Sequence, residues 1–491
     1  MTTPSPVVPD QVGTKQAPLK MFNMILFSVC AIMLLSQFTL TAEIGPTSVF
    51  WTIVIIVLFF IPYGLITSEL GSTYPDAGGI YSWVVRAFGK RWGTRVSWWY
   101  WVNVALWVPS VYLMFAGTLS SMFFHGNLNF WVQVLIAVVL IWVNYWVNSR
   151  SLETGTWVSN LGAGITMVMT VILVIAAVIF GMHNGSATPW SLSGMLPTGG
   201  IPAIVLALPI IIYNFLGFEL MSSASTQMRN PKRDVPRSIL VAAILIGAFY
   251  LLATVAMQVI QSPDDISETT GLIDSLQLAF GNSTFATVFI IILSVGALYC
   301  FFACLIPWTI GANLAASESS KRGDLPKIFG RTDPKLGTPT GAALLTSIVG
   351  TIVTVGYAIL SSVSNGSIDD VFWNLFAFSS VIFLLPYVVL MLVFLRLRKT
   401  DPNAVRPYRV PGSNTWIGII SWVPLVLLVL SVIFFVVNPF EFDWTATVPI
   451  IIGIVITVVI EEILVARAPK WTAERAADDA SLESVHGVCE R

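Results

Sequence analysis

The sequence predicts an all-α membrane protein with twelve transmembrane helices, and three observations support this fold class. Charged residues make up only 10% of the 491 residues, whereas a soluble domain carries about a quarter. Apolar runs long enough to cross a bilayer recur along the whole chain. If these runs cross the membrane one after another, lysine and arginine occur only in segments that lie on one side of it.

Twelve apolar runs are long enough to cross the hydrocarbon core, which takes about 20 residues of helix. Because the runs lack the alternating pattern of barrel strands, each is expected to be a helix. The predicted spans are residues 22–42, 49–70, 96–121, 130–148, 156–182, 201–224, 238–260, 284–313, 340–362, 371–395, 417–437 and 447–466.

The basic residues orient these spans. If the N-terminus lies in the cytoplasm, all 25 lysines and arginines fall in cytoplasmic segments and none in an outer connection. The outer connections carry only acidic residues, among them Asp264, Asp265 and Glu268. Since lysine and arginine accumulate on the cytoplasmic side, the sequence predicts a multi-pass protein of the inner (cytoplasmic) membrane with both termini in the cytoplasm.

The composition argues against several classes of protein. A net charge of −1 provides no basic surface for a nucleic acid. The cysteines inside the apolar runs are expected to be packed thiols rather than metal ligands. The histidines are isolated and lie outside the spans, so no enzyme activity, metal site or cofactor is expected; they are His125, His183 and His486.

Glu219 is the candidate functional carboxyl group, because it lies near the middle of the sixth predicted span with no lysine or arginine close by. Burial disfavours the charged form of a carboxyl group. Glu219 is therefore predicted to respond to protons or to gate the protein, the alternative being a plain hydrogen bond to a neighbouring helix. Glu43 and Glu69 lie near span ends and are expected at the level of the lipid headgroups.

The first and sixth spans are predicted to be interrupted. Asn214 and Gly217 are poor helix formers, and polar residues between Cys30 and Thr39 break the first run. Interruptions at corresponding positions suggest an inverted repeat of five plus five spans. The expected segments are a disordered leader (1–20), the first repeat (21–182), the second repeat (201–396), two further spans (416–467) and a polar cytoplasmic tail (468–491).

Two aromatic residues are candidates for the wall or gate of a pocket. Trp308 lies deep in the eighth span and Tyr213 lies beside the sixth-span interruption. Either ring face is available to an ammonium group, while simple packing is the alternative for both. Most of the other tryptophans, such as those in the Trp98–Trp101 cluster, are expected to pack or to lie at the membrane interface.

Four stretches of the chain resemble the amino acid–polyamine–organocation superfamily of transporters, and within it the bacterial glutamate/GABA-antiporter-like branch. They occur in the same order and at matching topological places, and they cover most of the chain. The stretches are Tyr74–Trp83 with Ala87–Gly89, Asn214–Glu219 with Arg229–Arg237, Trp308 with Arg322–Pro326 and Thr338-Pro339, and Arg406–Pro411.

The resemblance implies a LeuT-like core of five plus five helices, two added C-terminal helices, and a central site between spans 1, 3, 6, 8 and 10. By similarity to arginine/agmatine antiporters, it also implies that Glu219, Tyr213 and Trp308 take part in proton coupling or gating. The residues expected to bind substrate are Ile32, Met33, Ser36, Tyr213, Asn214, Gly217, Phe218 and Trp308. The chain departs from many relatives in having Leu34-Leu35-Ser36 in place of Gly-x-Gly, and Gln227 in place of a glutamate.

We therefore expect a secondary active transporter of amino acids or related amines that works by alternating access, with proton coupling or exchange. The α-carboxylate of a substrate would meet backbone N–H groups of the two interruptions, and its side chain would lie between Tyr213, Phe218 and Trp308. Since no basic residue lies in a span, acidic side chains are disfavoured. Exchange of an amino acid for its decarboxylation product, a nutrient sensor on the same fold, and a homodimer remain alternatives.

Overall fold

The computed structural model describes residues 20–76, 78–197, 200–220, 230–267, 270–281, 283–363, 368–437 and 444–489, and every regular element in these ranges is a helix. The elements are α1 (Met21–Ile32), α2 (Leu35–Glu43), α3 (Thr47–Ile55), the π-helical η1 (Ile56–Phe60), α4 (Ile61–Thr73), α5 (Ile80–Phe88), α6 (Lys90–Phe124), α7 (Phe130–Ser149), α8 (Leu152–Asn184), α9 (Leu192–Met195), α10 (Gly200–Tyr213), α12 (Pro231–Ile260), η3 (Pro263–Asp265), α13 (Gly271–Phe280), α14 (Thr284–Ala303), α15 (Leu305–Lys321), η4 (Lys327–Gly330), α16 (Thr340–Val363), α17 (Ile368–Thr400), α18 (Asn414–Val436) and α19 (Trp444–Cys489).

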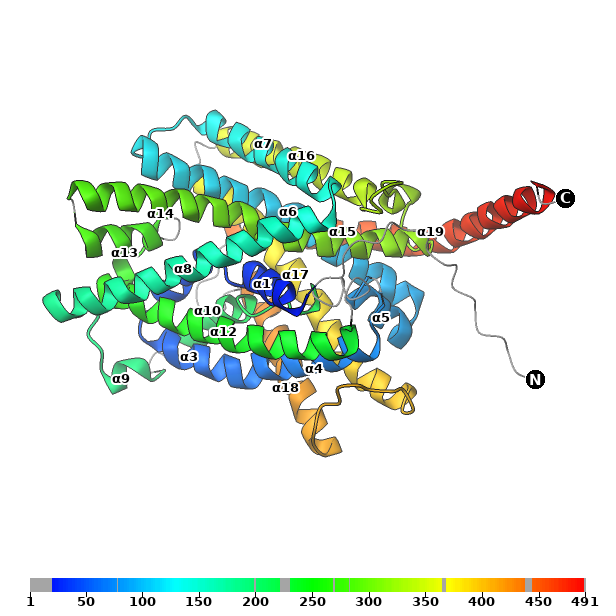
Figure 1. The fold of residues 1–491 in the computed structure, drawn as a ribbon, viewed down its shortest axis with the longest axis horizontal. Coiled ribbons are helices and arrows are strands. Elements are labelled where there is room, and N and C mark those ends of the chain that lie inside the picture. Colours follow the sequence, from blue (N-terminus) through cyan, green and yellow to red (C-terminus); the bar gives the residue numbers. More distant parts are fainter. Residues whose placement is uncertain are drawn as a thin grey trace.

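The helices form one bundle around a buried pair. Figure 1 shows α6, α7, α8, α12, α14 and α16 running along the long axis of the molecule. At the centre α6 packs along α17, and their apolar windows are the most buried among the nine helices in the described ranges that are long enough to cross a membrane. The peripheral helices instead expose large apolar side chains, among them Ile175, Val178 and Ile292. An apolar outer surface of this extent is suited to lipid rather than water.

The predicted spans correspond well to helices. Within the described ranges, nine helices are long and apolar enough to cross a membrane, and the bent pair α1–α2 makes a tenth candidate. Each of these ten overlaps one predicted span. The predicted spans 201–224 and 447–466 overlap α10 and α19, which are not among the ten.

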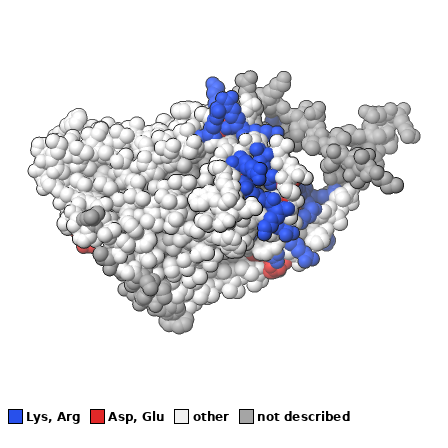
Figure 2. All heavy atoms as spheres, turned by 90° about the horizontal axis from the view of Figure 1, so that it is seen from below, with Lys and Arg blue, Asp and Glu red and all other residues white. Residues whose placement is uncertain are grey.

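Lysine and arginine side chains gather at one end of the molecule on the face shown in Figure 2. We call this the basic end; it carries α5, the α15–α16 connection and the α17–α18 connection. There the Tyr81 hydroxyl donates a hydrogen bond of 2.6 Å to Asp324. Burial raises the pKa of the Asp324 carboxyl, against the opposing influence of that hydrogen bond and of nearby basic groups. The opposite end, which carries α13, is called the outer end.

Glu69 is buried at the basic end, so the expectation that it lies among lipid headgroups is wrong. Its carboxylate accepts hydrogen bonds from the Arg398 guanidinium and, at 2.7 Å, from the Val410 backbone N–H. Arg406 completes the group, with its Nε 3.2 Å from a Glu69 oxygen. The last turn of α17 therefore brings Arg398 to the end of α4, and the α17–α18 connection adds Arg406 and the Val410 N–H.

The polar tail is helical as far as Cys489, because α19 continues without a break from Trp444 to that residue. Earlier in α19, Glu461 and the exposed Glu462 both pair with Arg95 of α6, at 2.9 Å and 2.6 Å. Further along, Arg475 donates to the Leu325 carbonyl at 3.3 Å. Figure 1 shows the end of α19 projecting away from the body. The expected leader, residues 1–19, lies outside the described ranges.

We predict that Glu69→Ala lowers the free energy of unfolding by about 3 kcal/mol, because it leaves two largely buried guanidinium groups without their shared carboxylate. Thermal or denaturant unfolding of the purified protein in detergent measures this. Asp76→Ala is the matched control, since its pair with Arg86 is exposed on both sides and is worth less than about 1 kcal/mol. Equal losses for the two variants would contradict the prediction.

Candidate functional site

Two helix breaks face each other in the middle of the bundle, as the sequence predicts for the first and sixth spans. The first lies at Met33 and Leu34, where α1 and α2 meet at a bend of 46°. The second follows Tyr213, and helical structure resumes at Glu219. Gly217 lies in this break with φ +131°, a conformation that residues with a Cβ rarely adopt. The continuation of the sixth span, residues 221–229, lies outside the described ranges.

Tertiary hydrogen bonds hold the first break open. Methionine and leucine are good helix formers, so local propensity does not explain an interruption at Met33 and Leu34. The Trp308 indole N–H donates to the Ala31 carbonyl at 2.9 Å, and the Tyr250 hydroxyl donates to the Ile32 carbonyl at 2.8 Å. These side chains give the last carbonyls of α1 partners in place of the missing next turn.

One hydroxyl group satisfies the backbone of the second break. The Tyr63 hydroxyl accepts hydrogen bonds from the Gly217 N–H at 3.2 Å and the Phe218 N–H at 3.0 Å. The same hydroxyl donates its hydrogen to the Glu219 carboxylate. A tyrosine hydroxyl offers one donor and two acceptor positions, and all three are occupied in Tyr63. These hydrogen bonds link α4 to the unwound part of the sixth span.

Glu219 lies in a cage of three tyrosine hydroxyls. Tyr100 of α6 and Tyr387 of α17 each donate to its Oε1 at 2.7 Å, while Tyr63 donates to its Oε2. All four side chains are buried, with at most 1% of their surface exposed. Three hydroxyl donors suit an ionised carboxylate, which only accepts hydrogen bonds. A proton on Glu219 would add a fourth hydrogen to the carboxyl group, and the new O–H would need an acceptor of its own.

A small cavity lies between the two breaks, with room for about one water molecule. We call it the central cavity. Its wall is largely aromatic: the Trp308 ring lies 5.7 Å from Trp107 and 5.1 Å from Phe383, and the Tyr213 ring lies 5.1 Å from Phe383. The lining residues are Ala31, Ile32, Leu34, Asn103, Trp107, Tyr213, Leu216, Trp308 and Phe383.

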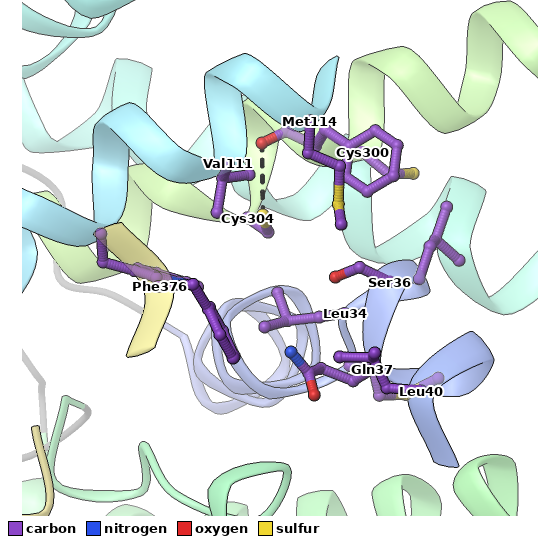
Figure 3. Close-up of a pocket in the computed structure, with 13 residues that line it drawn as sticks. Leu34, Ser36, Gln37, Leu40, Val111, Met114, Cys300, Cys304 and Phe376 are labelled. Carbon is purple, nitrogen blue, oxygen red and sulfur yellow. Dashed lines mark hydrogen bonds between the residues drawn. The ribbon is translucent and has the colours of Figure 1, made fainter. Parts of the chain in front are cut away.

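A second cavity, which also has room for about one water molecule, lies toward the outer end, and we call it the outer cavity (Figure 3). It shares Leu34 and Trp107 with the central cavity. In Figure 3, α2 contributes Ser36, Gln37 and Leu40, facing Cys300 and Cys304. A third small cavity follows, lined in part by Ser36, Thr270 and Ile273. The three cavities form a series from the helix breaks toward α13.

The structure brings most of the expected substrate-binding residues to these cavities. Ile32, Tyr213 and Trp308 line the central cavity, and Met33 and Ser36 line the outer cavity.

The other three expected residues lie beside the cavities. Asn214 donates to the Thr41 hydroxyl at 2.8 Å, and Gly217 packs against Ile32 and Trp308. Phe218 stacks on Phe60 and Tyr63 and lines none of the three cavities described. Phe383 completes the aromatic wall instead.

Sequence reasoning missed the three tyrosines of the cage and the polar Asn103. Tyr100 lies within the Trp98–Trp101 cluster, which is expected to pack or to lie at the membrane interface, but its hydroxyl donates a hydrogen bond to Glu219. A signal was available, because a tyrosine inside an apolar span needs a partner for its hydroxyl group. Tyr63 and Tyr387 meet that description in the second and tenth spans. Among the described residues, no cluster of three or more His, Cys, Asp or Glu could hold a metal ion.

Comparison with known proteins gives consistent results. A model of the amino acid permease family matches residues 19–460. The chain is 34% identical over 450 residues to the probable agmatine/putrescine antiporter of Lactococcus lactis subsp. lactis, covering 91% of this chain and 94% of that protein. It is 27% identical over 422 residues to an uncharacterized transporter of Legionella pneumophila subsp. pneumophila (84% and 88% covered). It is 22% identical over 440 residues to the glutamate/gamma-aminobutyrate antiporter of L. lactis (86% and 84% covered).

We predict that Gly217→Ala destabilises the protein by about 2 kcal/mol or more, because a Cβ would lie 2.9 Å from Ile32 Cγ1 at a positive φ. The thermal midpoint in detergent measures the loss. Gly356→Ala is the control, since it lies in α16 with nothing within 4 Å of its Cβ position and should be neutral or stabilising. A Gly217 variant as stable as the wild type would contradict the strain argued here.

Proposed function

The chain belongs to the amino acid permease family, and we propose that it is an antiporter that exchanges small organic cations across the cytoplasmic membrane by alternating access. The proposal includes the twelve-span topology with both termini in the cytoplasm and the inverted repeat of five plus five spans. The observation that carries it is the small central cavity between two helix breaks, whose lining includes four aromatic residues and no charged side chain.

The chemistry of the cavities favours a cation. The carbonyls of Ala31 and Ile32 have a second lone pair each, and the faces of Trp107 and Trp308 attract positive charge. None of the three cavities described has a lysine or arginine in its lining. An acidic substrate would therefore lose its hydration without gaining a basic partner. The similarity to an agmatine/putrescine antiporter supports the same class of substrate.

The small size of the cavities supports alternating access. Room for about one water molecule cannot hold an amine of several heavy atoms, so side chains must move before a substrate enters. Tyr213, in contact with Phe376 and Phe383, is a suitable outer barrier. The cage around Glu219 is a suitable inner barrier, because it joins α4, α6 and α17 beside the second helix break.

Glu219 is proposed to link the transport cycle to protons. Protonation adds a hydrogen to a cage in which three hydroxyls already donate to the carboxylate. The resulting rearrangement would reach the second break directly, since Tyr63 holds both Glu219 and the backbone of Gly217 and Phe218. Proton binding and the conformation of the sixth span would then depend on each other.

We predict that proteoliposomes containing the protein take up labelled putrescine or agmatine at least tenfold faster when they are preloaded with an unlabelled cation. Preloading should matter because an antiporter returns only with a second substrate bound. Labelled glutamate should show no acceleration. Empty liposomes are the control. If no member of a panel of amines and amino acids is exchanged, the proposed function is wrong, and binding without exchange would indicate a sensor.

We predict that Glu219→Gln removes most of the pH dependence of exchange between mildly acidic and neutral pH, because the amide cannot take up a proton. The initial rate of counterflow, measured across this range, tests the role of the carboxyl group. Asp76→Asn, which changes an exposed carboxyl at the basic end, is the control and should retain the wild-type profile. An unchanged profile for the Glu219 variant would remove Glu219 from the proton-coupling step.

A further inference from the structure

We propose that protons reach Glu219 from the basic end, along the contact between α6 and α15, through the carboxyl group of Asp324 and the hydroxyl group of Ser97. The inference rests on the proposed role of Glu219 in proton coupling and adds the route that this role requires. A buried carboxyl group can follow the pH of the surrounding water only if hydrogen-bonding groups lead to it. Tyr100 of the cage lies on α6, which begins at the basic end.

Two helices connect the cage to the basic end. At the cage, Tyr100 of α6 donates to Glu219, and a Cβ at Gly311 of α15 would lie 3.9 Å from the Tyr100 hydroxyl oxygen. At the basic end, a Cβ at Gly93 of α6 would lie 3.1 Å from the Tyr81 ring. Between these two points α6 and α15 pack against each other. Gly93 and Tyr100 are seven positions apart, so the distance to be covered along α6 is about 11 Å.

Ser97 lies between these two contacts, on the same side of α6. It follows Gly93 by four positions and precedes Tyr100 by three, which is the spacing of one helix face. Its side chain is fully buried, and its Oγ has no hydrogen-bond partner among the described residues. A serine in a helix can bond to a carbonyl of the preceding turn, as Ser110 of α6 does at 2.7 Å. The Ser97 hydroxyl makes no such bond and can instead bond to a buried water molecule.

Asp324 lies at the other end of this line. Its side chain is fully buried, and its Oδ2 accepts the hydrogen bond of 2.6 Å from Tyr81. Its Oδ1 has no hydrogen-bond partner in the described part of the chain. The Asp324 backbone N–H donates to the Ser319 carbonyl of α15 at 2.9 Å, which holds the carboxyl group beside the end of that helix. One carboxylate oxygen is thus available to receive a proton.

The charged groups that face Asp324 come from three parts of the chain: Lys90 of α6, Arg322 of the α15–α16 connection and Arg475 of α19. Burial raises the pKa of the Asp324 carboxyl, whereas the Tyr81 hydrogen bond and these three basic groups lower it. Lys90 and Arg322 are themselves exposed, so water reaches the surroundings of the carboxyl group. Asp324 is therefore placed to exchange protons with the water at the basic end.

The transfer is a relay in which each oxygen accepts one proton and releases another. Asp324 takes a proton from water and passes it to a water molecule beside Ser97. The Ser97 hydroxyl accepts this proton and releases its own toward the Tyr100 oxygen, which offers acceptor positions besides its donor. Tyr100 then gives its hydrogen to the Glu219 Oε1 that it already contacts at 2.7 Å. Over the whole relay Asp324 returns to its starting charge, and only Glu219 becomes neutral.

The test follows the proton on Glu219 itself. After a rapid drop in pH, the C=O infrared band of the protonated carboxyl group is recorded in the purified protein in detergent and is assigned by its absence in Glu219→Gln. Ser97→Ala and Asp324→Asn should each slow the appearance of this band by about tenfold or more. The final amplitude should equal that of the wild type, because neither change touches the cage.

Ser110→Ala is the matched control, because Ser110 is also buried in α6 but bonds within its own helix. Its rate of proton uptake should equal that of the wild type. The thermal midpoint of each variant is measured alongside. If Asp324→Asn does not fold, because it also alters the bond to Tyr81, the result for Ser97→Ala decides, since this change removes a single buried oxygen.

Each result has one meaning. Wild-type rates in Ser97→Ala and Asp324→Asn overturn the inference and leave the role of Glu219 intact, because protons would then arrive by another way, such as the cavities of the outer end. A slower rate with a reduced amplitude, or an equal slowing in Ser110→Ala, indicates a general disturbance and also overturns it. Absence of any Glu219 band overturns the proton role and the route together. Absence of exchange for every compound overturns the proposed function, while the infrared rates still decide the route.

Discussion

Backbone groups at two helix breaks have to be hydrogen-bonded without the help of bulk water, and this requirement organises the centre of the molecule. Side chains from other helices meet it. Trp308 and Tyr250 donate hydrogen bonds to the last carbonyls of α1. The Tyr63 hydroxyl accepts hydrogen bonds from two N–H groups of the sixth span. The breaks are therefore stable only when α4, α12 and α15 are packed around them. The local unwinding of the two spans therefore depends on the packing of their neighbouring helices.

The Tyr63 hydroxyl joins two roles at a single oxygen atom. It supports the unwound backbone, and it also contributes a donor to Glu219. A change in the charge of Glu219 therefore changes the support of the break, without any mobile element between them. The same oxygen takes the N–H groups that would otherwise be free for a ligand anion. Proton coupling, as proposed, and the conformation of the sixth span thus depend on one shared set of hydrogen bonds.

Much of the fold follows from local properties of the sequence. The length of apolar runs predicted the ten spans that match candidate membrane helices, and weak helix formers predicted the sixth-span break. The one-sided basic residues agree with the basic end of the molecule. The ion pair of Glu69 did not follow, because Arg398 lies 329 residues away and meets it only where the end of α17 packs against α4. The cage was missed for the same reason: Tyr63, Tyr100 and Tyr387 are 156, 119 and 168 residues from Glu219. Long-range pairing of this kind leaves little mark on a single sequence.

The continuous helix α19 has a mechanical consequence. A helix of 46 residues is about 70 Å long, more than twice the thickness of a bilayer core of about 30 Å. With residues 447–466 crossing the bilayer, as proposed, about 40 Å of the helix lies beyond the hydrocarbon as a stiff rod. Glu461 anchors it to Arg95 of α6, and Arg475 anchors it to the α15–α16 connection. A tilt of its membrane part by about 10° would sweep the far tip through about 7 Å. Small rotations among the spans are thereby converted into large displacements in the aqueous phase.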